Sequence, residues 1–239
     1  MAIEVFNRQE EKFIITEEVY RNIKPYLEEY MEVDDHNRNG NFYTICNIYF
    51  DTPDNEMIRK SIEKPAYKEK LRLRSYGIVG SRDKVYLEIK KKFDGSVNKR
   101  RTPIALEDAY HYIRTGQKPE VKYLMNDQVL NEIGHILHRY PMLQPALFLS
   151  YDRSAMFGIG DKNFRITFDT NIRTRRYDLS LDKGNYGDPL LPAGLWIMEA
   201  KLNKAAPLWF AEVLSRYKIY PTTFSKYGTE YRQMVLRRT

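Results

Sequence analysis

Residues 70–77 read Lys-Leu-Arg-Leu-Arg-Ser-Tyr-Gly, so a basic residue alternates with a leucine along the stretch. Successive side chains of a β-strand point to opposite faces, which gives the strand a period of two. Lys70, Arg72 and Arg74 therefore share one face, and the two leucines lie on the other. The stretch predicts a strand with one basic face and one face turned towards a hydrophobic core.

The same spacing of two recurs in several other segments. Where such strands are neighbours and their charged faces converge, they form a densely basic surface with a few carboxylates set into it. That composition suits a polyanion held together with a divalent cation. The charged positions are Arg8, Glu10 and Lys12, then Glu88 and Lys90, Lys99 and Arg101, Arg153 two residues after Tyr151, Arg165 on one face with Thr167 and Asp169, and finally Glu199 and Lys201.

A charged strand face also occurs in proteins where it binds no ligand. For a single strand it is most often the solvated surface of a sheet. Here seven strands carry charge on one face and the excess is basic. Like charges directly opposite each other on paired strands are destabilising. The recurrence therefore favours a surface kept for a ligand, with a solvated sheet as the alternative.

The composition describes a folded, basic protein of 239 residues with 39 Lys and Arg, 32 Asp and Glu, and 19 tyrosines. Cys46 is the only cysteine, which excludes an internal disulfide and a cysteine-based zinc site. The N-terminus lacks the apolar stretch of a secretion signal. No run reaches the roughly 18 to 20 apolar residues of a membrane span. We therefore expect a cytoplasmic protein without a membrane segment.

Periodicity and turn residues predict one α+β domain over residues 1–239, built on an antiparallel sheet. The expected strands cover about 4–15, 43–51, 67–76, 84–93, 96–104, 146–158, 163–176 and 195–202. The expected helices run from Thr16 to about Tyr30, from Thr52-Pro53 onwards, over 106–114, 120–140 and 207–217, and from about Ser225.

The segment Phe224-Ser225-Lys226 predicts a second kind of anion site. A helix that begins at Ser225 places its free N–H groups and the Lys226 ammonium within reach of one phosphate oxygen. An ordinary N-cap beside a solvated lysine is an equal alternative. His135 and His138, three residues apart on an expected helix, are more often an incidental pair than a metal site.

Taken in order, these segments resemble the VTC domain, the polyphosphate polymerase domain of the vacuolar transporter chaperone family. That family lies within the triphosphate tunnel metalloenzyme (CYTH-like) superfamily. The resemblance spans nearly the whole chain, and its specificity comes from the order and spacing of motifs that are weak singly. The matching stretches are Arg-Gln-Glu-Glu-Lys-Phe at 8–13, Ile-Tyr-Phe-Asp-Thr-Pro at 48–53, Lys-Leu-Arg-Leu-Arg-Ser-Tyr-Gly at 70–77, Tyr-Leu-Glu-Ile-Lys-Lys at 86–91, Ser-Tyr-Asp-Arg-Ser-Ala at 150–155, Phe-Arg-Ile-Thr-Phe-Asp-Thr-Asn at 164–171, Met-Glu-Ala-Lys at 198–201 and Phe-Ser-Lys-Tyr at 224–227.

The resemblance implies a closed antiparallel barrel of about eight strands, with the charged faces lining a tunnel and the helices outside. It implies ATP and polyphosphate as substrates and Mn²⁺ or Mg²⁺ as cofactor. The implied phosphate-binding cations are Lys12, Arg72, Arg74, Lys90, Lys99, Arg153, Arg165 and Lys226, with Arg8, Lys70, Arg101 and Lys201 as further candidates. Tyr151 and Ser225 would donate hydrogen bonds to phosphate, and the implied metal ligands are Glu199 first, then Glu10 and Glu88.

Two positions depart from the family pattern. Hydrolytic tunnel enzymes carry Glu-x-Glu-x-Lys on the first strand, where this chain has Arg8-x-Glu10-x-Lys12. This exchange weakens the case for two-metal hydrolysis and favours the binding of a phosphate chain. Eukaryotic polymerase members place a lysine where this chain has Thr223, so binding near that end is expected to be weaker.

We therefore expect an ATP-dependent polyphosphate polymerase or a related phosphotransferase. The alternatives are a metal-dependent tri- or polyphosphatase and a catalytically silent module that binds polyphosphate. Nucleic-acid binding is not expected, because it needs basic residues on an exterior face. The sequence leaves protein partners open.

Overall fold

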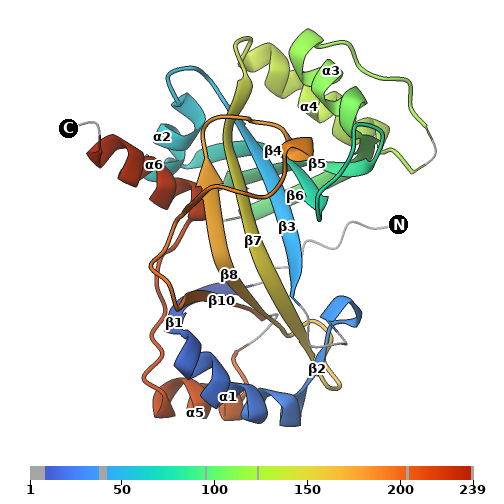
Figure 1. Cartoon of the computed structure of the whole chain (residues 1–239). Coiled ribbons are helices and arrows are strands. Elements are labelled where there is room, and N and C mark those ends of the chain that lie inside the picture. The colour runs from blue at the N-terminus through green and yellow to red at the C-terminus, as the bar shows by residue number, and fades with distance from the viewer. Residues whose placement is uncertain (1–8, 38–41, 95, 123, 203–204, 238–239) are drawn as a thin grey trace. The chain divides into compact units, whose positions relative to one another are not determined.

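The computed structural model describes residues 9–37, 42–94, 96–122, 124–202 and 205–237 (Figure 1). Within these ranges the fold is α+β, with ten strands in one antiparallel sheet and six α-helices. The expected fold class is thereby confirmed. Arg8, one of the expected phosphate ligands, lies outside the described residues.

The elements alternate irregularly along the chain. The strands are β1 (Gln9–Thr16), β2 (Met31–Val33), β3 (Tyr43–Asp51), β4 (Tyr67–Tyr76), β5 (Lys84–Phe93), β6 (Ser96–Ala105), β7 (Gln144–Gly158), β8 (Arg165–Arg175), β9 (Asp188–Pro189) and β10 (Leu195–Leu202). The α-helices are α1 (Glu17–Tyr30), α2 (Glu56–Glu63), α3 (Leu106–Thr115), α4 (Asp127–Arg139), α5 (Leu208–Arg216) and α6 (Lys226–Leu236), and short 3₁₀ turns cover Asp35–Asn37 and Leu181–Lys183.

The strand order is β1-β10-β8-β7-β3-β4-β5-β6, with β2 paired to β7 and β9 paired to β8. In the part of the chain that the structure describes, this path ends at β1 on one side and at β6 on the other. The expected closed barrel is therefore not confirmed.

The chain divides into two compact units. The first unit comprises Met1–Thr44, Tyr151–Ile172 and Leu191–Ser225. The second unit comprises Ile45–Ser150, Arg173–Leu190 and Lys226–Thr239. A single domain over the whole chain stays a prediction.

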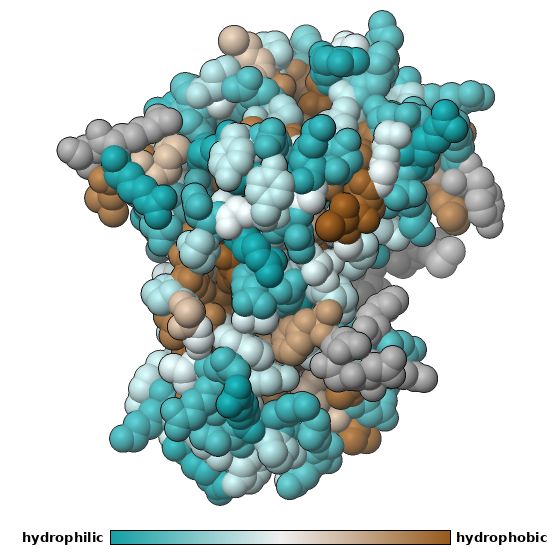
Figure 2. Space-filling view, in the orientation of Figure 1, coloured by the Kyte–Doolittle hydropathy of each residue, from teal (hydrophilic) through white to brown (hydrophobic). Residues whose placement is uncertain are grey.

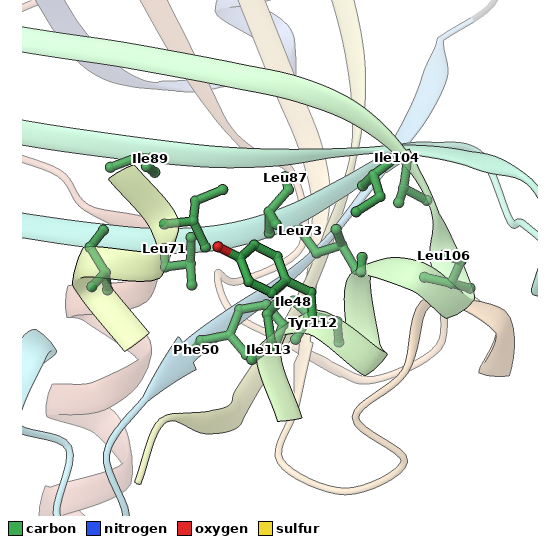
Figure 3. Close-up of a cluster of buried hydrophobic side chains, with 14 of the residues drawn as sticks. Ile48, Phe50, Leu71, Leu73, Leu87, Ile89, Ile104, Leu106, Tyr112 and Ile113 are labelled. Carbon is green, nitrogen blue, oxygen red and sulfur yellow. The ribbon is translucent and has the colours of Figure 1, made fainter. Parts of the chain in front are cut away.

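Strands β4, β5 and β6 form an antiparallel meander in the second unit, with β3 paired to β4. The alternation expected for residues 70–77 is present. Leu71 and Leu73 are fully buried, while the basic residues that alternate with them, Lys70, Arg72 and Arg74, are partly exposed. Leu71 and Leu73 join a core in which the ring of Tyr112 lies among isoleucine and leucine side chains (Figure 3). The Tyr112 hydroxyl donates to the carbonyl of Leu130 at 2.7 Å, so this buried phenol is satisfied.

Helices α3 and α4 pack beside this meander (Figure 1). Helix α3 ends at Thr115, and Gly116, with a φ of +72° and an N–H bond to the Tyr112 carbonyl, forms a left-handed C-cap. Helix α4 begins at Asp127 instead of the expected residue 120. Asn126 sets this start, because its side chain accepts from the Val129 N–H at 3.1 Å.

Helix α2 also begins later than expected, at Glu56 instead of Thr52-Pro53. The buried carboxylate of Asp51 accepts from the N–H groups of Met57 and Ile58 at 2.8 and 3.0 Å. The Thr52 hydroxyl accepts from the Glu56 N–H at 2.9 Å. These bonds satisfy the first N–H groups of the helix from outside it, so residues 52–55 form the turn that precedes it.

The first unit contains β1, β10 and part of β8 as consecutive antiparallel strands. Helix α1 begins as expected after Thr16, whose hydroxyl accepts from the Val19 N–H at 3.1 Å. Phe13 on β1 is fully buried and meets the Phe210 ring edge-on, with 6.5 Å between ring centroids. The alternate residues of β1 and β10 thus build a second hydrophobic core.

Hydrophilic residues dominate the surface visible in Figure 2. Among the described residues, no helix combines the length and apolar character needed to cross a membrane.

We predict that Leu87→Ala lowers the free energy of unfolding by about 2–5 kcal/mol, because Leu87 is fully buried and the change leaves a cavity. Leu236→Ala is the matched control, since the Leu236 side chain is 74% exposed and its truncation opens no cavity. Chemical denaturation of both variants measures the difference. Equal losses in the two variants would contradict the assignment of the core.

Candidate functional site

The polar face of the second unit is built from three cross-strand rows on β4, β5 and β6. Lys70 pairs with Lys90, and Lys90 pairs with Lys99, so one row carries lysine at all three positions. The next row contains Arg72, Glu88 and Arg101, and the third contains Arg74, Tyr86 and Pro103. The strands thus bring together the seven expected site residues of this segment.

Glu88 balances the charge in the middle row. Its carboxylate lies 2.7 Å from Nε and 2.6 Å from Nη2 of Arg72, and 3.9 Å from Nε of Arg74. Burial alone would raise the pKa of Glu88, but the charges of Arg72, Arg74 and Arg101 outweigh burial and lower the pKa. Glu88 therefore stays ionised and holds the two β4 guanidinium groups in place.

Tyr49 on β3 joins the same face and was not expected there. Arg72 Nη1 donates to the Tyr49 hydroxyl oxygen at 3.2 Å. Burial raises the pKa of this phenol, but the charges of Arg72, Lys70 and Arg74 and the bond from Arg72 together lower the pKa to about 8. Nearby positive charges and a hydrogen bond to the ionised form both favour the phenolate.

Tyr227 connects the start of α6 to this face. Its hydroxyl donates to Asp51 at 2.9 Å, its ring centroid lies 5.0 Å from that of Tyr49, and the Lys70 ammonium lies 6.0 Å from its ring. Helix α6 begins at Lys226, immediately before this anchor. The Asp51–Tyr227 bond therefore fixes the position of the expected phosphate ligand Lys226.

Glu199 is the centre of the corresponding face in the first unit. It pairs with Lys12 on β1 and with Thr167 on β8. Lys201 Nζ lies 2.8 Å from one carboxylate oxygen of Glu199, and Lys12 Nζ lies 3.9 Å from the other. Burial opposes the charge on Glu199, but Lys201, Lys12 and Arg153 reverse that effect and hold its pKa far below the usual value.

Lys12 is fixed from several sides. Its ammonium lies 3.3 Å from a Glu10 carboxylate oxygen and donates to the carbonyl of Phe224 at 3.3 Å. Its own carbonyl accepts from the Thr222 N–H at 2.7 Å. The segment that carries Ser225 is thus attached to β1 within the first unit.

Two arginines complete the first-unit face. Arg153 makes two hydrogen bonds to the fully buried Asp169, at 2.6 and 2.8 Å, and its guanidinium lies 5.0 Å from the Tyr151 ring. Asp169 raises the pKa of Arg153 against the effect of burial, so the charge is permanent. Arg165 lies 3.7 Å from Asp34 and directly opposite Lys201.

Two buried polar atoms on this face have no hydrogen-bond partner among the described residues. The Thr167 hydroxyl and Arg165 Nε are both buried and make no hydrogen bond within the part of the chain that the structure describes. Buried polar groups normally have a partner, and an orphaned one costs about 1–3 kcal/mol. Both atoms belong to strand β8, with Thr167 facing Glu199 in the register, where a phosphate oxygen or a metal-bound water would satisfy them.

The chemistry of Glu199 and Glu10 fits a divalent metal. Mg²⁺ is commonly held by one or two carboxylates together with substrate phosphates and water. Glu199 is ionised, and both carboxylates lie beside Lys12. No group of three or more His, Cys, Asp or Glu side chains able to hold a metal occurs among the described residues, so the remaining ligands would come from substrate and water.

A family model of the VTC domain matches residues 7–235. The chain belongs to the VTC domain family. This confirms the resemblance deduced from the motifs, and it covers nearly all of the chain.

Solved structures show a related fold. A protein from Bacillus halodurans described as a candidate adenylate cyclase superposes with a TM-score of 0.54 at 14% identity, covering 91% of this chain and 95% of that chain. A Hippeastrum protein described as an adenylyl cyclase candidate with dominant triphosphatase activity gives a TM-score of 0.49 at 12% identity, covering 92% of each chain. No curated protein matches the sequence. At such identities the likeness to the Bacillus protein shows the fold.

Each of the two units brings together a part of the expected site. The second unit holds Lys70, Arg72, Arg74, Glu88, Lys90, Lys99, Arg101 and Lys226, and the first holds Glu10, Lys12, Tyr151, Arg153, Arg165, Glu199, Lys201 and Ser225. Sequence reasoning missed Tyr49 and gave no role to Thr167 or Asp169. Thr167 and Asp169 follow Arg165 at spacings of two along β8, so the sequence already placed the three side chains on one face of the strand.

We predict that one tyrosine titrates with a midpoint of about pH 8 and that Tyr49→Phe removes this step. The phenol ionises more readily in the folded state than at its unfolded pKa of about 10. Ionisation of Tyr49 therefore adds stability that is complete above pH 10 and is lost as the pH falls through about 8. Tyrosinate absorbance measures the midpoint, and Tyr177→Phe, at an exposed tyrosine outside this face, is the control. An unchanged titration in Tyr49→Phe would contradict the described environment.

Proposed function

We propose that this chain is a polyphosphate polymerase-like phosphotransferase that moves the terminal phosphoryl group of ATP onto polyphosphate with a divalent metal. The observation that carries the proposal is the row of Lys70, Lys90 and Lys99 on three adjacent strands. Like charges placed directly opposite each other weaken strand pairing. A phosphate chain, with a negative charge on every unit, relieves that repulsion. Membership of the VTC domain family supports the same substrate class.

The residues of the first unit suit the reacting phosphoryl group. Phosphoryl transfer depends on in-line positioning and on neutralising the phosphate oxygens, with little covalent chemistry by the protein. Lys12, Lys201 and Arg165 provide fixed positive charge, and the orphaned Thr167 hydroxyl provides a donor. Such groups stabilise the transition state because they are organised before the reaction.

Glu199, with Glu10, would hold the metal. Bound there, Mn²⁺ or Mg²⁺ supplies electrostatic stabilisation of the phosphate oxygens. The protein groups hold the phosphate chain and orient it, and the lysines around Glu199 keep its carboxylate ionised. The closed barrel of about eight strands is part of the same proposal.

A silent polyphosphate-binding module is the second candidate. It is favoured by the lysines at both oxygens of Glu199 and by the two hydrogen bonds that Asp169 accepts from Arg153. These pairs occupy carboxylate oxygens that a hydrolytic site would need as metal ligands.

Incubation of the whole chain with ATP and Mn²⁺ distinguishes these functions. Long-chain polyphosphate as product supports the polymerase. Orthophosphate as the sole product identifies a phosphatase and overturns the proposal. Binding of polyphosphate without turnover of ATP identifies the silent module and also overturns it.

We predict that Glu199→Gln lowers metal-dependent turnover by about two orders of magnitude, the size of loss when one electrostatic contact to a transition state is removed. Polyphosphate binding should be retained, because the change removes a negative charge from the basic face. Glu11→Gln is the matched control, since Glu11 is exposed on the opposite face of β1. Unaltered turnover in Glu199→Gln would remove Glu199 from the reaction.

A further inference from the structure

The polar face of the second unit changes character along its strands. Its last row and the strand end beyond it carry the aromatic residues Tyr86 and Tyr76. Their rings meet edge to face, with 5.8 Å between centroids and 85° between planes. The phosphate-binding function proposed above assigns no task to either ring.

Arg101 joins the two tyrosines into one cluster. Its guanidinium carbon lies 4.6 Å from the centroid of the Tyr86 ring. Its Nη1 donates to the Tyr76 hydroxyl at 3.4 Å. Tyr76 is 49% exposed, so the cluster lies open to solvent and outside the buried core. Packing within the hydrophobic core therefore does not account for it.

A guanidinium beside tyrosine rings is a surface on which a planar base can stack. Aromatic faces and guanidinium planes both stack on nucleobases, and such stacking tolerates any base because every base has a π-face. The neighbouring cations attract the phosphates of the same molecule. Few ligand classes combine a flat aromatic group with several negative charges.

The order of groups along β5 matches the order of parts in a nucleoside triphosphate. Tyr86, Glu88 and Lys90 share one face, and a strand advances about 3.3 Å per residue, so about 13 Å separate Tyr86 from Lys90. Arg72 and Arg101 lie in the row between them, and Lys70 and Lys99 flank Lys90. The order aromatic ring, guanidinium, ammonium thus parallels a base followed by successive phosphates over a comparable length.

We propose that Tyr76, Tyr86 and Arg101 form a binding site for the base of a nucleoside triphosphate whose phosphates lie along the arginine and lysine rows. This inference rests on the proposed function, because it assigns the nucleotide end of the same phosphate-binding face. It adds a direction, with the base at the β4–β5 turn and the phosphates running from the arginine row towards the lysine row. It also predicts that ATP and GTP bind with similar affinity, because stacking accepts any base.

The test compares ligands with and without a base. Calorimetry of the whole chain without divalent metal measures the affinity for ATP, GTP and inorganic tripolyphosphate at one fixed salt concentration. We expect Tyr86→Leu to weaken ATP and GTP binding about tenfold, the order of the loss of one base stack, and to leave tripolyphosphate binding within about twofold. Tyr86→Phe should restore nucleotide affinity because it keeps the ring. Tyr177→Leu, at an exposed tyrosine outside this face, should bind all three ligands as the unmodified chain does.

A second measurement does not depend on a variant. In the nuclear magnetic resonance spectrum of ATP bound to the unmodified chain, stacking should move the adenine ring protons upfield. Adenine protons that keep their free positions while ATP is bound would overturn the base site.

The outcomes separate this inference from the function on which it rests. Equal losses for ATP and tripolyphosphate in Tyr86→Leu, or no loss for either, would overturn the base site while phosphate binding stands. Failure of the unmodified chain to bind ATP and tripolyphosphate would overturn the proposed function and the base site together.

Discussion

The central constraint on this structure is the repulsion between positive charges that share one face of a sheet. Each unit places lysine and arginine side chains on neighbouring strands, where they repel each other. A buried carboxylate offsets this at the middle of each face, Glu88 in the second unit and Glu199 in the first. Both carboxylates have lowered pKa values because their basic neighbours outweigh the cost of burial. The cations are therefore held in place, and in the second unit Glu88 neutralises only part of the positive charge of its rows.

The same strands build the hydrophobic cores with their other faces. Leu71, Leu73 and Leu87 are fully buried one residue away from the charged positions. A slip of one residue in the register would move every charge into the core, so the hydrophobic side fixes the register that aligns the cations. Stability and the proposed phosphate binding thus depend on one alternating pattern. This explains how a face so rich in positive charge can be kept ready for a ligand.

Features that depend on residues close together in the sequence could be predicted from the sequence more fully than features that depend on specific hydrogen bonds or on distant residues. The strands at 43–51, 67–76, 84–93 and 195–202 were predicted with their observed bounds, because alternation is a local signal. The starts of α2 and α4 were wrong because Asp51 and Asn126 fix them through hydrogen bonds that periodicity does not reveal. The VTC family was recognised from motif order, and the family match confirms it.

The candidate site was predictable where it follows the strand period and less so elsewhere. In each of β4, β5 and β10 the charged residues could be assigned to one face of their own strand from spacing alone. Tyr49 was missed because its role depends on the register between β3 and β4, which places it opposite Arg72. Closure of the barrel is harder still, since it depends on pairing between strands far apart in the sequence, and it stays a prediction.

The melting temperature of the whole chain with tripolyphosphate tests the central claim most directly. The comparison is sodium chloride at the same ionic strength, because salt alone also screens repulsion between cations. A ligand at about 100 times its dissociation constant adds about 2.7 kcal/mol to the free energy of unfolding, so we expect a rise of several degrees above the salt control. Identical melting curves in tripolyphosphate and sodium chloride would contradict the account that these faces are organised to bind a phosphate chain.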